Sequence, residues 1–248
     1  MKIMQINLWM GRMAKGLMRY IEKEHPDVIC MQEVSNADFE VMLPDRMFDI
    51  LARIKEVSGL EHEYFSPRYS IDVAGGTAPF GNAILSRFPF ESTKTVQIEH
   101  TTVEHVTARS YQHNVNNLQV VRISANSVSW TIANNHGHHE LEPLGNHESV
   151  AAMLRIVDEL KGVDGPLVFC GDLNVMPESP AMRVFDGWMD DIVAHSGVTT
   201  TLARVNVDRD VVCDHILVND RVAVKSFKVD DVIISDHYPL VAELEVQK

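Results

Sequence analysis

Polar side chains recur along this chain at the ends of short apolar runs that resemble buried strands. The strongest example is Gly171-Asp172-Leu173-Asn174, which directly follows the apolar run at residues 167–170. An acidic-amide pair held in a tight turn after a rigid strand is placed for chemistry. Because the design repeats, the sequence indicates a reaction class as well as a fold class. The other clusters are Ile6-Asn7, Met31-Gln32-Glu33, Asn134-Asn135-His136, Cys213-Asp214 and Ser235-Asp236-His237.

The spacing of apolar residues predicts a layered α/β fold. Helical spacing covers residues 13–24, 39–57 and 145–160, with Leu154 among the inward positions of the last helix. A chain of 248 residues is below the size at which two cores become usual, so we expect one domain over residues 1–248. Runs of β-branched and apolar residues predict strands at 2–8, 27–31, 83–85, 96–98, 118–123, 128–133, 167–170, 216–218, 222–229 and 240–246.

Charge and cysteine content narrow the expected partners and location. The formal net charge of −13 opposes non-specific attraction to phosphate polymers unless basic residues cluster on one face. An acidic chain is compatible with a metal-dependent phosphate enzyme, because carboxylates bind the cation. Cys30, Cys170 and Cys213 lie in apolar runs and are expected to be reduced core residues. No secretory signal or membrane-spanning run is evident, so we expect a cytoplasmic protein without membrane insertion.

Two clusters offer groups for metal binding and proton transfer. Glu33 follows the apolar run at residues 27–31, where a carboxylate can hold a hard divalent ion. His237 follows Asp236, and Asp214 lies on a separate predicted strand. One carboxylate can therefore orient the imidazole while the other reaches the metal. The alternative interpretations are a solvated glutamate at a strand end and a partly buried structural histidine.

Asp172, Asn174 and His136 complete the set. In an extended turn Asp172 and Asn174 can face one pocket, where the acid holds or deprotonates a water and the amide holds an oxyanion. The alternative is an Asx turn that caps the short helix expected after Pro177. His136 differs from the other histidines because it ends the apolar run at 130–133. The histidines expected to be surface or structural residues are His138, His139, His147 and His215.

These motifs resemble, in the same order, those of the endonuclease/exonuclease/phosphatase superfamily, which has the deoxyribonuclease I-like fold. The resemblance spans nearly the whole chain. It implies a four-layer α/β/β/α sandwich with two central mixed β-sheets and a site at one edge. It also implies a divalent metal, Mg²⁺ or Mn²⁺, and hydrolysis of a phosphoester bond. The motifs are Ile6-Asn7, Gln32-Glu33-Val34, Gly81-Asn82-Ala83-Ile84-Leu85-Ser86-Arg87, Asn135-His136, Gly171-Asp172-Leu173-Asn174, Cys213-Asp214-His215-Ile216 and Ser235-Asp236-His237-Tyr238-Pro239-Leu240.

The resemblance assigns metal and water roles to five residues. Glu33 would be the main metal ligand, with Asn7 and Asp236 close to the metal or the phosphate. Asp172 would position or activate the attacking water, and Asn174 would hold a phosphate oxygen. In-line placement of water and neutralisation of phosphoryl charge are the requirements of this chemistry.

The resemblance assigns phosphate and proton-transfer roles to five more. His237, oriented by Asp214, would act as general base or as a phosphate donor. His136 would stabilise the phosphate or protonate the leaving oxygen. Asn82 matches the family's Gly-Asn position, where it would support the site and its phosphate, and Arg109 matches a position where members place a phosphate-contacting arginine.

The substrate expectation rests on the histidine in Asn135-His136, which abasic-site endonucleases of this superfamily generally lack. With the acidic charge, it favours a phosphodiesterase or phosphatase acting on a small molecule or a single-stranded nucleic acid. The alternatives are a DNA nuclease or DNA-repair phosphodiesterase of the same superfamily, and a non-catalytic binding protein on this fold. The arginines that could line the site mouth are Arg12, Arg46, Arg68, Arg87 and Arg109.

Overall fold

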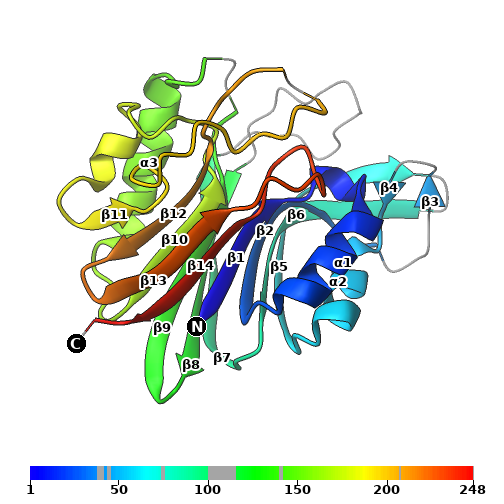
Figure 1. Cartoon of the computed structure of the whole chain (residues 1–248), viewed down its shortest axis with the longest axis horizontal. Helices are drawn as coiled ribbons and strands as arrows, with labels where there is room; N and C mark the ends of the chain where they lie inside the picture. Colours follow the sequence, from blue (N-terminus) through cyan, green and yellow to red (C-terminus); the bar gives the residue numbers. More distant parts are fainter. Residues whose placement is uncertain are drawn as a thin grey trace.

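The computed structural model describes residues 1–37, 42–43, 46–73, 76–99, 116–139, 142–206 and 208–247. Two six-stranded sheets form the centre of the molecule (Figure 1). Helices α1 (Ala14–Glu24) and α2 (Ile50–Ser58) pack on one sheet, and α3 (His147–Leu160) packs on the other. The fold is therefore the four-layer α/β/β/α sandwich that the sequence predicts.

The first sheet has the strand order β13-β14-β1-β2-β6-β5. Its strands β1 and β2 run parallel, and the other neighbouring pairs run antiparallel. The sheet is therefore mixed, as expected. Its strands are β1 (Lys2–Asn7), β2 (Val28–Ser35), β5 (His62–Val73), β6 (Gly76–Ser86), β13 (Val222–Val229) and β14 (Leu240–Val246).

The second sheet repeats this plan with the order β11-β12-β10-β9-β8-β7. Here β9 and β10 form the parallel pair. Its strands are β7 (Phe90–Glu99), β8 (Asn116–Ala125), β9 (Val128–His136), β10 (Leu167–Asp172), β11 (Met189–Asp191) and β12 (Asp214–Asn219). The remaining elements are the strands β3 (Met42–Leu43) and β4 (Arg46–Met47) and the 3₁₀ turns η1 (Trp9–Gly11) and η2 (Met182–Phe185).

The two parallel pairs bring the polar strand ends to one edge of the sandwich. Parallel neighbours finish on the same side, so β1 and β2 deliver their carboxyl ends together, as do β9 and β10. The antiparallel neighbours β14 and β12 begin where β1 and β10 end. Residues at the ends of β1, β2, β9 and β10 and residues just before or at the starts of β12 and β14 therefore lie at the same edge of the sandwich.

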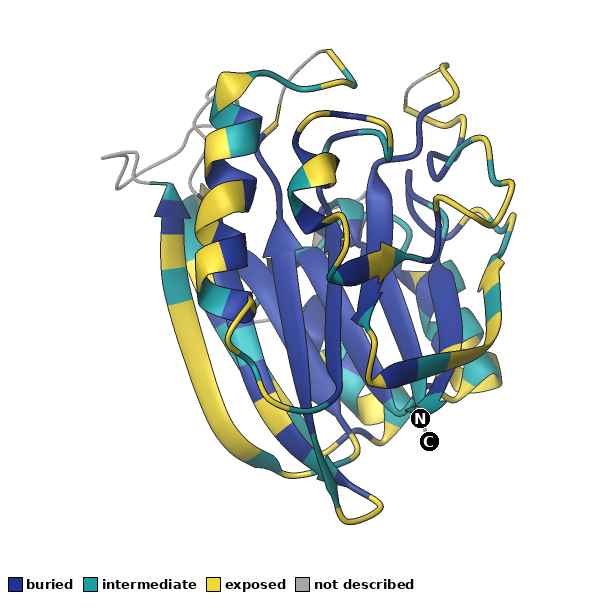
Figure 2. Ribbon diagram, turned by 90° about the vertical axis from the view of Figure 1, so that its left-hand side faces the viewer, coloured by how far each residue is buried: buried dark blue, intermediate teal, exposed yellow. Residues whose placement is uncertain are grey.

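The core between the sheets is apolar over most of its area. Twenty buried residues from both sheets and their connections form it, among them Cys30 and Cys170. Burial of apolar surface stabilises such a core by about 25 cal/mol per Å² removed from water. In Figure 2 the central strands are buried along most of their length, whereas the helices expose their outer faces. Cys213 is also buried and all three thiols are free, as predicted.

Two details of the sequence prediction are wrong. The helix expected over residues 39–57 begins only at Ile50, after the paired strands β3 and β4. Pro44 disfavours helical backbone at the residue before it, Leu43, which lies in β3. Leu154, expected to point inward, is 49% exposed, because it lies one residue beyond the buried Met153 on α3. In the described part of the chain, no helix is long and apolar enough to cross a membrane.

Candidate active site

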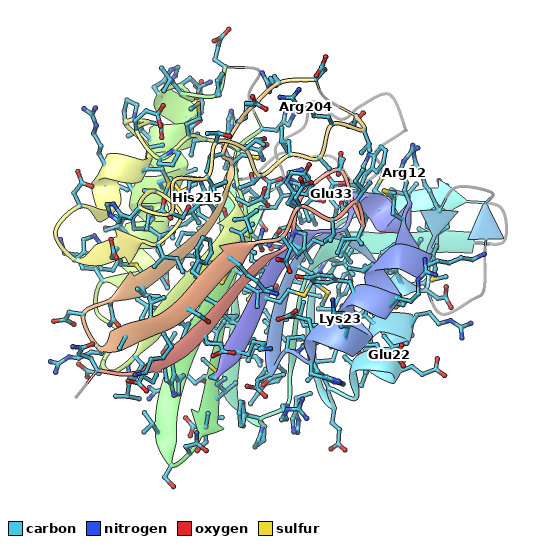
Figure 3. All side chains as sticks on the ribbon, viewed as in Figure 1. Arg12, Glu22, Lys23, Glu33, Arg204 and His215 are labelled. Atoms are coloured by element: carbon cyan, nitrogen blue, oxygen red, sulfur yellow. The ribbon has the colours of Figure 1, made fainter. Side chains whose placement is uncertain are left out.

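The predicted site residues collect at the edge where the parallel pairs end. Asn7 ends β1, His136 ends β9 and Asp172 ends β10. In the second sheet His136 and Asp214 are the direct cross-strand neighbours of Asp172. Glu33, near the end of β2, lies at the same loop-bearing edge, where Figure 3 labels it. Strand topology alone therefore brings these distant parts of the sequence together.

Asp172 lies at the centre of this cluster. The Nδ2 group of Asn7 donates a hydrogen bond of 2.9 Å to Oδ2 of Asp172. Nε2 of His136 lies 3.5 Å from the same oxygen, and Nε2 of His237 lies 3.8 Å from it. The other carboxylate oxygen accepts the backbone N–H of Asn174 at 3.2 Å. Burial raises the pKa of Asp172, while the charge of His237 acts in the opposite direction.

His237 is held from its other side by Asp214. Nδ1 of His237 lies 2.7 Å from Oδ2 of Asp214, which orients the ring so that Nε2 faces Asp172. Oδ1 of Asp214 accepts a hydrogen bond of 2.9 Å from the Gln5 amide, so Asp214 is anchored at both oxygens. Burial opposes a charge on the His237 ring, but Asp214 and Asp172 together raise its pKa well above the usual value. The pair is a histidine oriented by a buried carboxylate, as predicted.

Glu33 supplies the carboxylate best suited to a divalent cation. Its backbone is in the left-handed region, with φ of 53°, at a β-bulge between Met31 and Val34. Such a bulge redirects one side chain out of the sheet's alternation. Burial, and next the negative charge of Asp236, raise the pKa of Glu33 to about 7. The cluster therefore concentrates carboxylates that repel one another, and a hard cation bound through their oxygens relieves that repulsion.

Asp236 and Asn7 both act on the Glu33 carboxylate, Asp236 through its negative charge and Asn7 through a side-chain hydrogen bond. The Ser235 hydroxyl donates to the Asn7 backbone carbonyl at 2.7 Å and lies 3.2 Å from Oδ1 of Asp236, linking the start of the β14 segment to the end of β1. Asn206 donates to Oδ2 of Asp236 at 3.0 Å. The oxygens of Glu33, Asp236 and Asn7 are a donor set that fits Mg²⁺ or Mn²⁺.

A second group, Asp172, Cys213 and His237, offers potential ligand atoms within 4.8 Å of one another. Its chemistry does not suit a hard cation. Burial raises the pKa of the Cys213 thiol to about 12, so the sulfur stays protonated. His237 is already engaged with Asp214, and its raised pKa keeps it protonated. These three side chains are therefore better suited to proton transfer than to holding a hard cation.

His136 has a cationic partner, which the sequence does not reveal. Nη1 of Arg68, on β5, lies 2.7 Å from Nδ1 of His136. Burial, and next the charge of Arg68, lower the pKa of His136 well below its usual value. Arg68 was one of five arginines proposed for the site mouth, and no motif distinguishes it from the others. A register shift between Pro67 and Tyr69 in β5 marks its position, which only the structure shows.

The other four arginines have different positions. Arg87 pairs with Asp27, at the start of β2, and therefore lies at the opposite end of the sheet. Arg12 stacks over Trp9, 4.8 Å from the ring centroid, just after the Asn7 strand end. Nη1 of Arg46 lies 3.4 Å from the sulfur of Met10. Arg109 lies outside the described residues, and its phosphate contact stays a prediction.

The predicted site residues Asn174 and Asn82 differ in how deeply their side chains are buried. Asn174 has a φ of 58° and its side chain donates to the Gly137 carbonyl at 3.4 Å, which places it beside the His136 strand end. Asn82 is fully buried and donates to Oδ1 of Asn117 at 3.1 Å. Asn82 therefore lies beneath the site surface, where it can support the site but does not offer an exposed phosphate contact.

A buried polar layer supports the cluster from below; Gln32 and Asn134 belong to the polar strand ends that the sequence shows, whereas Gln5 and the contacts among the three were not expected. The amides of Gln5 and Gln32 bond to each other at 3.0 and 2.8 Å, and Gln32 also donates to Asn134 at 2.6 Å. Gln5 continues the chain to Asp214. These amides link the two sheets under the cluster, so the positions of its side chains depend on both sheets. Alternating glutamine and asparagine within apolar strand runs is the sequence signal that could have indicated them.

The family model described as the Endonuclease/Exonuclease/phosphatase family matches residues 4–237 of this chain. No curated protein matches the sequence. Solved structures share this fold at low sequence identity, as three examples show.

The first is an endonuclease/exonuclease/phosphatase from Bacteroides vulgatus, with a TM-score of 0.74 and 18% identity, covering 99% of this chain and 98% of the other. The second is a mannosyl-6-phosphatase from Bacteroides thetaiotaomicron, with a TM-score of 0.71, 17% identity and 99% of both chains covered. The third is the human Nocturnin catalytic domain with bound sulfate, with a TM-score of 0.71 and 18% identity, covering 100% of this chain and 93% of the other.

Proposed function

Because the chain belongs to the endonuclease/exonuclease/phosphatase family, we propose that it is a divalent-metal-dependent phosphoesterase. The observation that carries the proposal is the convergence of three side chains on Oδ2 of Asp172. Asn7, His136 and His237 approach this oxygen at 2.9, 3.5 and 3.8 Å from the end of β1, the end of β9 and the loop before β14. A buried carboxylate surrounded by donors is suited to holding and deprotonating a water. We propose further that residues 1–248 act as one domain, since both sheets contribute to the same core.

Glu33, Asp236 and Asn7 would hold the cation, Mg²⁺ or Mn²⁺. When bound, this ion supplies charge neutralisation for the phosphoryl oxygens. The fit rests on the donor chemistry: two carboxylates and one amide oxygen, with Glu33 carrying a pKa raised to about 7 by burial and neighbouring negative charge.

Side chains of the protein supply the remaining roles, which are water activation and phosphoryl binding. Asp172 orients the attacking water and accepts its proton, and Asn174 holds a phosphoryl oxygen without adding charge. His237 is oriented by Asp214 at 2.7 Å and presents Nε2 toward the reacting group. His136 presents Nε2 from the opposite side of Asp172. Both imidazoles therefore face the space in which a phosphoryl group would lie.

The proposed substrate is a small phosphoester or a single-stranded nucleic acid. A net charge of −13 disfavours a long polyanion. Support comes from one structural relative that is described as a mannosyl-6-phosphatase and from another, human Nocturnin, that has a bound sulfate. The second candidate is a nuclease or DNA-repair phosphodiesterase, favoured by Arg12 stacked over Trp9 beside the Asn7 strand end.

A matched substrate panel tests the proposal. It contains labelled single-stranded and duplex DNA, a 5′-phosphotyrosyl oligonucleotide, an inositol phosphate, mannose 6-phosphate and a phospholipid, each with Mg²⁺, with Mn²⁺ and with a chelator. Glu33→Ala is the blank. Turnover of small substrates alone supports a metabolic phosphoesterase, and cleavage of DNA supports the second candidate. If calorimetry shows Mg²⁺ binding and no substrate is cleaved, the proposal is wrong and a binding protein on this fold is the better account.

A further inference from the structure

The two imidazoles that flank Asp172 have partners of opposite charge. Nδ1 of His237 faces the carboxylate of Asp214 at 2.7 Å, whereas Nδ1 of His136 faces the guanidinium of Arg68 at the same distance. A carboxylate can only accept a hydrogen bond from the ring, and a guanidinium can only donate one. The two rings therefore carry their protons differently, although both direct Nε2 toward Asp172.

The Arg68 contact determines which nitrogen of His136 is protonated. A guanidinium does not lose its proton in proteins, so Nδ1 of His136 must accept. An imidazole that accepts at Nδ1 carries its hydrogen on Nε2 and is neutral. Nε2 lies 3.5 Å from Oδ2 of Asp172, so this hydrogen lies on the side of the ring that faces Asp172. His136 is only 8% exposed, so water has little access to compete with Arg68 and Asp172 for its ring nitrogens.

We propose that Arg68 is a positioning residue that fixes His136 as a neutral Nε2–H donor to a phosphoryl oxygen of the substrate. This inference rests on the proposed phosphoesterase function. It decides between the two roles that the sequence leaves open for His136: the ring stabilises the phosphate, and it does not protonate the leaving oxygen. A neutral ring that donates its Nε2 hydrogen would have to become an imidazolate if it lost that proton, so His136 donates a hydrogen bond without transferring the proton.

The charges around His136 agree with this assignment. Burial lowers its pKa most, and the charges of Arg68 and His237 lower it further. Among the described groups that lie against the ring, Asp172 is the one carboxylate, and it faces Nε2 at 3.5 Å. The neutral donor therefore adds no positive charge to the site, which differs from the charged ring of His237.

Side-chain ¹⁵N NMR of histidine measures the tautomer without any substrate. His136→Gln identifies the His136 signal by its loss. We expect the wild-type ring to show an unprotonated Nδ1 and a protonated Nε2 at neutral pH. In Arg68→Met the Nδ1 atom loses its donor, so a second tautomer appears, and Arg68→Lys restores the wild-type pattern. Arg122→Met, which removes an exposed arginine bonded to Ser129, leaves the signal unchanged. An imidazolium or an Nδ1–H tautomer in the wild type would overturn the proposal.

Amide substitutions test the same assignment through turnover. The amide nitrogen of glutamine can take the place of Nε2, whereas that of asparagine reaches only the place of Nδ1. Loss of one oxyanion donor costs about 10²–10³-fold in kcat, which we expect for His136→Ala and His136→Asn. His136→Gln should stay within about tenfold of wild type, because it keeps a neutral donor at the right place. Equal loss in His136→Gln and His136→Ala would contradict a hydrogen-bonding role.

The two measurements separate the inference from the function on which it rests. Absence of turnover in the wild type would overturn the phosphoesterase function and with it the contact to substrate, while the NMR result would still decide whether Arg68 fixes the tautomer. Turnover with the wrong tautomer would overturn the inference and leave the phosphoesterase function in place.

Discussion

The Nδ1 atom of His237 lies 2.7 Å from Oδ2 of Asp214, and the second oxygen of Asp214 is held by the Gln5 amide at 2.9 Å. His237 comes from the loop before β14 and Asp214 begins β12, so the pair joins the two sheets. A second histidine–carboxylate pair joins His215 to Asp191 at 2.8 Å, but His215 follows Asp214 in β12 and therefore points to the opposite face of the sheet. The two pairs allow catalytic and structural roles to be compared.

Asp214→Asn should lower kcat by about 10²–10⁴-fold, because an amide removes the negative charge that stabilises the protonated His237 ring and can turn its own donor toward Nδ1. The KM should change little, since Asp214 is buried beneath the ring and does not reach the substrate. Steady-state kinetics on the best substrate of the panel measures both values. Asp191→Asn is the matched control and should leave kcat near wild type. Equal losses in both variants would show a general effect on folding.

Asp191→Asn should instead reduce stability in a pH-dependent way. Burial opposes the charge of His215, but Asp191 outweighs it and raises the pKa of the ring. Nδ1 of His215 faces Asp191 and Nε2 faces the Val175 carbonyl, each at 2.8 Å, so both nitrogens donate. A raised folded-state pKa means that this stability is fully present below the unfolded value of 6.5 and is lost as the pH rises through the folded value.

Urea unfolding at several pH values measures this effect. The free energy of unfolding of Asp191→Asn should fall below wild type by about 1.5–3 kcal/mol in acid solution near pH 6, the worth of a hydrogen bond to a charged group. The difference should shrink in alkaline solution. A deficit that grows with pH would mean that His215 is neutral in the folded protein.

Glu33→Gln should weaken cation binding, because it removes one negative charge from the donor set while keeping its size. We expect the Kd for Mg²⁺ or Mn²⁺ to rise at least about tenfold. Isothermal titration calorimetry measures the affinity without substrate. Glu159→Gln removes a half-buried carboxylate on α3 that pairs with Lys94, and it should leave the Kd unchanged. An unchanged Kd in Glu33→Gln would place the cation elsewhere.

Gly137→Ala should destabilise the protein and impair the site together. Gly137 follows His136, and a Cβ atom there would collide with the backbone carbonyl of Leu173, next to Asp172. Backbone cannot yield as a flexible side chain can, so we expect a loss of about 1–3 kcal/mol in the free energy of unfolding. Gly162→Ala is the control, since nothing lies within 4 Å of its added Cβ. Chemical denaturation measures the free energy of unfolding of both variants. Equal values would contradict the prediction, because they would show that the ends of β9 and β10 can move apart to make room for the added Cβ.

The sequence predicted the strand ends of this site because each follows an apolar run that can be recognised locally. Asn7, Asp172 and His136 lie at the last position of their strands, and β-sheet pairing then brings them together. Arg68 could not be predicted as the partner of His136, because no local pattern records a contact between residues on β5 and β9, which belong to different sheets. The helix expected over 39–57 failed for a related reason: apolar spacing was counted across Pro44, where a proline interrupts helical backbone.

The most direct test is metal-dependent hydrolysis of bis(para-nitrophenyl) phosphate and para-nitrophenyl phosphate by wild type and Asp172→Asn, with Mg²⁺ binding of each measured in parallel. We expect the wild type to release para-nitrophenol from at least one ester, and a chelator to abolish the release. Asp172→Asn should bind Mg²⁺ yet lose at least about 10²-fold in kcat, because it cannot accept a proton from water. Turnover that survives chelation, or an Asp172→Asn variant as active as wild type, would contradict a water-activating role for this cluster.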